Sequence, residues 1–120
     1  MFLTRALLGS SNFVETLDIL RDTGTGTSDG FSLNITFAKQ EGSPVMHNVE
    51  VGPSTEDKTE SELSVLTLSH GDFHAHCNKY LRLKIPEVTG IGLDSSTHRH
   101  KAIGRHLRPN CVERIKEVLR

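Results

Sequence analysis

The chain has 120 residues, of which 35% are hydrophobic and 24% are charged, and its formal net charge at pH 7 is −1. This length suits one domain with a core of its own, and the near-neutral charge argues against general nucleic-acid binding. No apolar run approaches the roughly 20 residues that a membrane-spanning helix needs. We therefore expect a protein that resides in the cytoplasm and does not span a membrane.

Two cysteines, Cys77 and Cys111, are too few for a disulfide framework, and they lack the Cys-x-x-Cys spacing. We expect both to be reduced thiols.

The charged residues are distributed unevenly along the sequence. Residues 1–78 carry 4 basic and 11 acidic side chains, whereas residues 79–120 carry 10 basic and 4 acidic ones. One hypothesis is therefore a non-catalytic interaction module whose basic C-terminal helices bind an acidic partner or nucleic acid. The other is that the two halves complement each other or face solvent.

The N-terminal residues predict two helices. Apolar residues recur at helical spacing in residues 3–8 and again in residues 14–20. Asn12, with Glu15 three residues later, is a typical capping pair for the second helix. Arg5 lies inside the first apolar patch and no small-residue cleavage site follows, which favours an amphipathic helix over a secretory signal.

Strands follow a Gly- and Thr-rich loop at residues 24–30. Apolar and polar residues alternate in residues 31–37 and in residues 45–51, which predicts a β-hairpin with its turn at residues 40–43. Residues 52–62 contain Pro, Ser, Thr and acidic residues without apolar anchors. They predict an exposed acidic loop.

A second hairpin is predicted from residues 63–67 and 73–77, closed near residues 69–72. The Asp-Ser-Ser sequence at residues 94–96 then predicts the start of a helix, because either serine can accept the orphan N–H groups. The side chains that this helix buries are expected to be Ala102, Ile103 and Leu107. Asn110 with Glu113 opens a last helix.

The predicted order of elements is two helices, four strands and two helices. Such clustering predicts an α+β fold in which helices pack on an antiparallel sheet.

Two motifs in the second half of the chain resemble those of a known family. Residues 73–81 read Phe-His-Ala-His-Cys-Asn-Lys-Tyr-Leu, and residues 93–99 read Leu-Asp-Ser-Ser-Thr-His-Arg. The pair resembles the acyl-coenzyme A:isopenicillin-N acyltransferase family of N-terminal-nucleophile cysteine hydrolases, where a His-x-Asn-His/Tyr strand end precedes an Asp-Ser-Ser-x-x-Arg helix.

The resemblance extends over nearly the whole chain. Residues 2–8 and 13–20 resemble the family's paired helices, and residues 48–53 resemble its Asn-Ile-Glu-Val-x-Pro strand. The Asn-Lys-Tyr-Leu-Arg-Leu sequence at residues 78–83 is most similar to the animal branch, which hydrolyses β-alanyl amines such as β-alanyl-dopamine or carcinine.

This resemblance implies that residues 1–120 are a single partial domain, the C-terminal part of a four-layer αββα sandwich. It also implies an oxyanion-binding role for Asn78 and an orienting role for Arg99, without a cofactor. The residues it places against the substrate are His76, Lys79, Tyr80 and Asp94. Lys79 departs from the family pattern, in which His or Tyr commonly follows the Asn.

The family's nucleophile is a cysteine that self-cleavage exposes as a new N-terminus, with its own α-amino group as the base. Neither Cys77, next to the oxyanion Asn, nor Cys111, at a helix start, suits that role. We therefore expect a C-terminal fragment of an amidohydrolase or acyltransferase acting on small N-acyl or N-aminoacyl amines. It would be inactive without its partner, the N-terminal part that carries the nucleophile.

Each assignment has a simpler alternative. Asn78 can cap a turn before Tyr80, and Arg99 can pair with Asp94 or with solvent. A zinc site is the alternative for the histidines, but their spacing matches no standard zinc motif, so we predict no metal. The residues weighed for zinc are His74, His76, Cys77, His98, His100 and His106.

Overall fold

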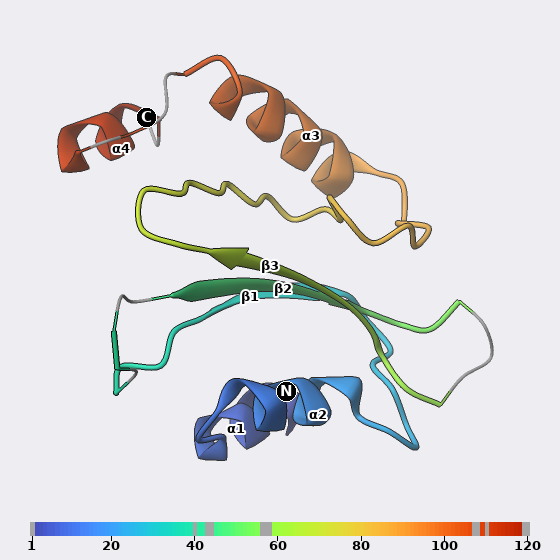
Figure 1. Ribbon diagram of the computed structural model, residues 1–120. Coiled ribbons are helices and arrows are strands. Elements are labelled where there is room, and N and C mark those ends of the chain that lie inside the picture. The colour runs from blue at the N-terminus through green and yellow to red at the C-terminus, as the bar shows by residue number, and fades with distance from the viewer. Residues whose placement is uncertain are drawn as a thin grey trace. The chain divides into compact units, whose positions relative to one another are not determined.

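The computed structural model describes residues 2–39, 41–42, 45–55, 59–106, 109 and 111–118. Its elements, in chain order, are α1 (Phe2–Ala6), the 3-10 turn η1 (Leu7–Gly9), α2 (Phe13–Arg21), β1 (Phe31–Ile35), β2 (Met46–Gly52), β3 (Glu62–Leu68), α3 (Ile91–Ile103) and α4 (Val112–Val118) (Figure 1). The chain divides into two compact units. The first unit contains residues 1–70 and 80–85, and the second contains residues 71–79 and 86–120.

The first unit is built on a three-stranded antiparallel sheet in the order β1-β2-β3. Val49 at the centre of β2 pairs with Leu33 of β1 and with Val65 of β3. The predicted α+β class is confirmed by this sheet with its helices, and so is the predicted hairpin between the strands that became β1 and β2.

The predicted strand at residues 73–77 is wrong. These residues are irregular, and the partner that β3 takes is β2. Alternation of apolar side chains indicates which side chains face inward, but a strand also needs a neighbouring backbone to pair with. Of the apolar side chains in this segment only Cys77 is buried, at 6% exposed, whereas Phe73 is 39% exposed.

One face of the sheet is apolar because the odd-numbered residues of β2 point to it. Val49, Val51 and Leu20 of α2 are fully buried together. Figure 1 shows α1 and α2 lying across this face. The partly buried residues packed around the cluster are Leu7, Phe13, Phe31, Leu33, Ile35 and Leu63.

The other face of the sheet carries buried polar groups. Asn48 and Glu50 of β2 are 1% and 0% exposed. Residues 81–83 hydrogen-bond to Glu50 through their backbone, so this segment covers the polar face. The central strand is therefore enclosed on both sides.

The capping pair predicted for α2 is confirmed. The Asn12 side chain accepts a hydrogen bond from the Glu15 N–H at 2.9 Å. The Glu15 carboxylate turns back to Ser11, accepting from its N–H at 2.8 Å and its hydroxyl at 2.9 Å. These bonds, the backbone one first, hold the pKa of Glu15 below its usual value of 4.5.

The lowered pKa of Glu15 predicts a pH-dependent contribution to stability. Because the folded-state pKa is lower than the unfolded one, the contribution is present above pH 4.5 and is lost as pH falls through the folded pKa. Thermal unfolding of the native sequence and of Glu15→Gln, measured between about pH 2 and 7, should show a gap that closes at acid pH. Asp18→Asn, on the same helix, serves as the control; an equal gap for both variants would contradict the prediction.

The second unit contains α3 and α4. Helix α3 begins at Ile91 with Gly90 as its N-cap, so the predicted start at Asp94 is wrong. Gly90 has a φ of 148°, a value that glycine adopts readily, and no side chain caps the helix. A start at Asp94 would place Arg99 near the beginning of the helix, whereas in the structure Arg99 lies in the helix interior.

Burial on α3 also differs from the prediction. Ala102 is exposed and Ile103 is half-buried, whereas the fully buried side chain is Ser96. Leu107 and Asn110 lie outside the described residues. Of the predicted loop at residues 52–62, the end residues lie in β2 and β3, and residues 56–58 are outside the described part.

Candidate active site

Asn78 lies in a tight turn that follows the buried thiol of Cys77. The Lys79 N–H donates to the Cys77 carbonyl at 2.7 Å, which closes the turn around Asn78. Asn78 is exposed, and its side chain makes no hydrogen bond to another described residue. The turn fixes the backbone of Asn78, and its exposed side-chain amide can donate to the oxygen of a bound carbonyl group.

Two further residues near Asn78 were predicted to contact substrate. Lys79 and His76 are both half-buried. The His76 ring lies 6.0 Å from the His74 ring, centroid to centroid, with the planes tilted by 53°. Two neighbouring histidine rings, which are both polar and aromatic, therefore come shortly before Asn78 in the chain.

Arg99 is an exposed residue of α3 that takes its partner from its own helix. Its Nη2 donates to the Ser96 hydroxyl at 3.2 Å, and Ser96 is fully buried. The alternative ion pair with Asp94 is not formed among the described residues. The exposed Asp94 instead presents its backbone carbonyl to His98 Nδ1 at 2.8 Å.

Tyr80 belongs to the first unit, whereas the other predicted site residues belong to the second. Its hydroxyl donates to the Val51 carbonyl at 3.3 Å. An added Cβ at Gly52 would lie 2.6 Å from the Tyr80 oxygen, and one at Gly30 would collide with the same ring. The ring therefore fills a slot that two glycines leave open.

The structure thus brings Asn78, Arg99, His76, Lys79 and Asp94 into one compact unit. Asn78 and Arg99 do not hydrogen-bond to each other. Each of the two is exposed and keeps donor groups available for a bound molecule.

A polar cluster in the first unit was missed by the sequence analysis. Glu50 and Arg82 approach to 3.7 Å, and the Arg82 Nη2 donates to the Asn48 side chain at 2.7 Å. The available signal was the polar pair Asn48 and Glu50 on one face of a strand whose other face is Val49 and Val51.

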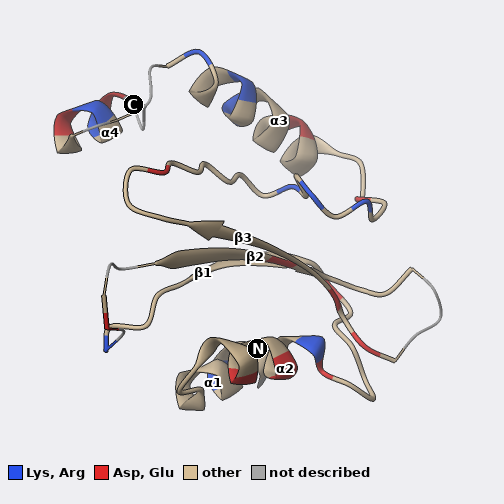
Figure 2. Ribbon diagram, in the orientation of Figure 1, with Lys and Arg blue, Asp and Glu red and all other residues tan. Residues whose placement is uncertain are grey.

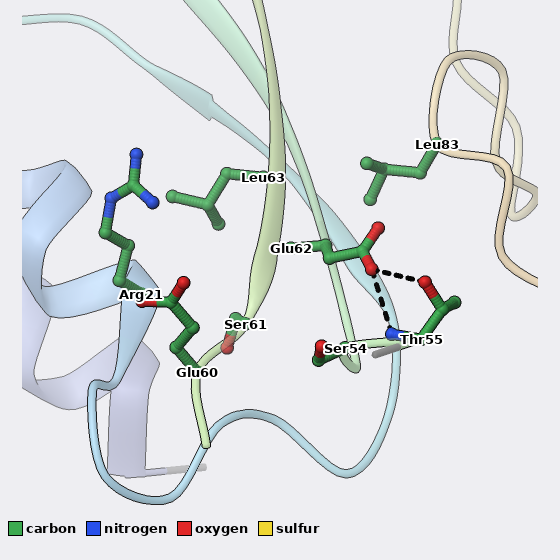
Figure 3. Close-up of a pocket in the computed structure, with 8 residues that line it drawn as sticks. All are labelled: Arg21, Ser54, Thr55, Glu60, Ser61, Glu62, Leu63 and Leu83. Carbon is green, nitrogen blue, oxygen red and sulfur yellow. Dashed lines mark hydrogen bonds between the residues drawn. The ribbon is translucent and has the colours of Figure 1, made fainter. Parts of the chain in front are cut away.

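A pocket of about 350 Å³ lies elsewhere in the first unit (Figure 3). Glu62 points across it to Thr55, whose N–H and hydroxyl donate to the Glu62 carboxylate at 2.9 and 2.7 Å. None of the predicted site residues lines it. The residues that do are Arg21, Ser54, Thr55, Glu60, Ser61, Glu62, Leu63 and Leu83.

The two C-terminal helices, for which a basic docking face is predicted, carry charges of both signs. Figure 2 shows acidic residues beside the basic ones on both α3 and α4. On α4, Arg114 pairs with Glu117 at 3.2 Å.

The described part of the chain contains no group of three or more His, Cys, Asp or Glu side chains that could hold a metal ion. It also contains no helix of the length and apolar character needed to cross a membrane. Both cysteines are free thiols; Cys77 is buried and Cys111 is exposed.

Comparison with known proteins identifies the family. The family model described as acyl-coenzyme A:6-aminopenicillanic acid acyl-transferase matches residues 1–120, the full length of the chain. The chain belongs to this family. The resemblance inferred from the motifs is thereby confirmed.

A relative in the family supports the suggested animal branch. The β-alanyl-dopamine/carcinine hydrolase of Drosophila melanogaster is 30% identical over 118 residues, which are 98% of this chain. The chain covers 30% of the length of that relative. No solved structure matches the chain.

Proposed function

We propose that the protein containing these 120 residues is a cysteine amidohydrolase that cleaves small N-aminoacyl amines of the β-alanyl type. The observation that carries the proposal is the match between 98% of the chain and the Drosophila β-alanyl-dopamine/carcinine hydrolase. Because the two sequences align over almost the whole chain, we infer a common reaction class, with hydrolysis favoured over acyl transfer.

The proposed fold of the whole protein is the αββα sandwich of N-terminal-nucleophile hydrolases. The first unit supplies a sheet covered by helices α1 and α2 on one face, which corresponds to one helix layer and one sheet layer. The chain covers 30% of its relative, and we propose that the remainder supplies the second sheet and its helices.

The nucleophilic cysteine is proposed to lie outside these 120 residues. Cys77 is 6% exposed, which limits access of a substrate to its thiol, and Cys111 lies just before α4 with no candidate base assigned to it. The part required is therefore a further segment of the same enzyme, in which self-cleavage exposes the nucleophilic Cys as a new N-terminus, and these 120 residues alone would be inactive.

Two residues are proposed to act on the reacting amide. The thiolate attacks the carbonyl carbon, and Asn78 donates to the oxyanion that forms. Arg99 orients the polar part of the substrate through its guanidinium group. The amine then leaves with the proton that the α-amino group of the nucleophilic cysteine took from its thiol, and water hydrolyses the thioester, which releases β-alanine and restores the thiol. Contacts to substrate are proposed for His76, Lys79, Tyr80 and Asp94.

The proposal is tested on the natural protein purified from its source. Intact mass and N-terminal sequencing should show two pieces, one of which begins with Cys and contains this sequence. Release of β-alanine from β-alanyl-dopamine and from carcinine should accompany that processed form. A single 120-residue species that begins with Met1 would contradict the proposal, because no suitable nucleophile would be present.

A further inference from the structure

Glu50 is the most enclosed carboxylate in the described structure. It lies on the central strand with 0% of its surface exposed, between Ser32 of β1 and Ser64 of β3. Burial of an isolated carboxylate costs several kcal/mol, so its hydrogen-bond partners must compensate for the lost water.

Three consecutive backbone N–H groups supply that compensation. Leu81 donates to Oε1 of Glu50 at 2.8 Å, while Arg82 and Leu83 donate to Oε2 at 2.9 Å each. Successive N–H groups that converge on one anion are a recurring anion-binding arrangement of the backbone. Here the bound anion is a side chain of the same protein, and it fixes the path of three residues at once.

The Arg82 side chain adds hydrogen bonds to the neighbouring strands. Together with the bonds from residues 81–83 to Glu50, these bonds form what we call the Glu50 anchor. The Arg82 Nε donates to the Ser64 hydroxyl at 3.1 Å, and its Nη2 donates to Asn48 Oδ1 at 2.7 Å. Asn48 in turn donates to Ser32 at 3.1 Å and to Asn34 at 3.0 Å. One connected set of bonds therefore ties residues 81–83 to all three strands.

The location of this anchor in the sequence is close to the predicted oxyanion donor. Replacement of a buried ion pair by apolar side chains of similar volume is often neutral for stability, so the burial of this carboxylate is weak evidence for a purely stabilising role. Tyr80 immediately precedes the first anchored residue, and Asn78 comes two residues earlier. The anchor therefore fixes the chain just beyond the segment that carries the oxyanion donor.

We propose that Glu50 is a positioning residue of the hydrolase, whose carboxylate fixes the backbone of residues 81–83 and thereby holds the end of the Asn78 segment. The inference rests on the proposed function, since the effect on the reaction acts through Asn78. Displacement of a reacting group by about 1 Å can cost up to roughly 10²-fold in rate.

The test compares Glu50→Gln with Glu62→Gln in the whole natural protein. Gln has one acceptor oxygen, so at least one of the three N–H groups loses its partner. Glu62 is a matched control, because it lies on β3 and accepts from Thr55 instead of residues 81–83. Hydrogen exchange at residues 81–83 should become about tenfold or more faster in Glu50→Gln and stay unchanged in Glu62→Gln.

The kinetic part of the test separates positioning from stability. We expect Glu50→Gln to lower kcat about tenfold with less than about a twofold change in KM. In a protein that already carries Asn78→Ala, addition of Glu50→Gln should lower kcat no further. Equal losses with and without Asn78 would overturn the proposal, as would faster exchange at residues 81–83 with unchanged kcat.

Two further results complete the design. Glu50→Asp keeps the charge but is one methylene shorter, so exchange and kcat should take values between those of the native and Gln forms. If Glu50→Gln does not fold, Glu50→Asp carries the test. The proposal would then be overturned if Glu50→Asp left both the exchange at residues 81–83 and kcat unchanged. If the native protein cleaves no β-alanyl amine, the proposed function fails, and the exchange comparison alone decides whether Glu50 is the anchor.

Discussion

Replacement of Asn78 by alanine should lower the kcat of the whole protein toward β-alanyl amines by about 10² to 10³-fold. The reason is that its amide donor acts on charge that develops only as the carbonyl oxygen becomes an oxyanion. KM should change little, because the ground-state carbonyl gains much less from the same bond. Steady-state kinetics with β-alanyl-dopamine and carcinine measure both constants.

Two companion variants sharpen the Asn78 prediction. Asn78→Asp replaces the donor with a carboxylate of the same size that repels an oxyanion, so its loss should be at least as large as that of alanine. Thr89→Ala changes an exposed polar residue of the same unit and should leave kcat unchanged. Retained turnover in Asn78→Ala would show that Asn78 only shapes the turn between Cys77 and Lys79.

Local signals in the sequence were sufficient for several elements. The cap of α2 depends on Asn12 and Glu15, which are three residues apart, and such a contact is visible in the sequence itself. The hairpin of β1 and β2 follows from alternation over two neighbouring segments. In both cases the stabilising contacts join residues close in the chain, so the pattern carries most of the information.

The start of α3 shows where a local signal misleads. Asp94 and the two serines after it have the composition of an N-cap, yet the helix begins earlier, at Ile91. Ser96 is fully buried and accepts a hydrogen bond from Arg99 one turn later. Burial within the unit therefore determines the position of these serines, and sequence composition does not report burial.

Part of the candidate site could be predicted from local sequence motifs, and part of it could not. The Asn78 and Arg99 motifs were recognised from their residues, and the family to which they pointed is confirmed. The roles of the two residues stay predictions. The Glu50 anchor was not recognised, because Glu50 and its partners are more than 30 residues apart in the chain. A glutamate between valines on a strand predicts only a polar face, and the N–H groups that bury it become evident only in three dimensions.

Replacement of Leu20 by alanine should lower the free energy of unfolding by about 2 to 5 kcal/mol. Leu20 is fully buried against Val49 and Val51, so removal of its side chain leaves a cavity between α2 and the sheet. The measurement is urea unfolding of the protein that contains these residues, followed by circular dichroism.

Leu8→Ala provides the matched control for Leu20, because it removes the same atoms from a side chain that is 88% exposed on η1. It should change the free energy of unfolding by less than about 0.5 kcal/mol. Equal costs at the two positions would contradict the assignment of the core to the face between α2 and β2. A large difference would show that this face of the sheet, which is opposite the Glu50 anchor, holds the core of the first unit.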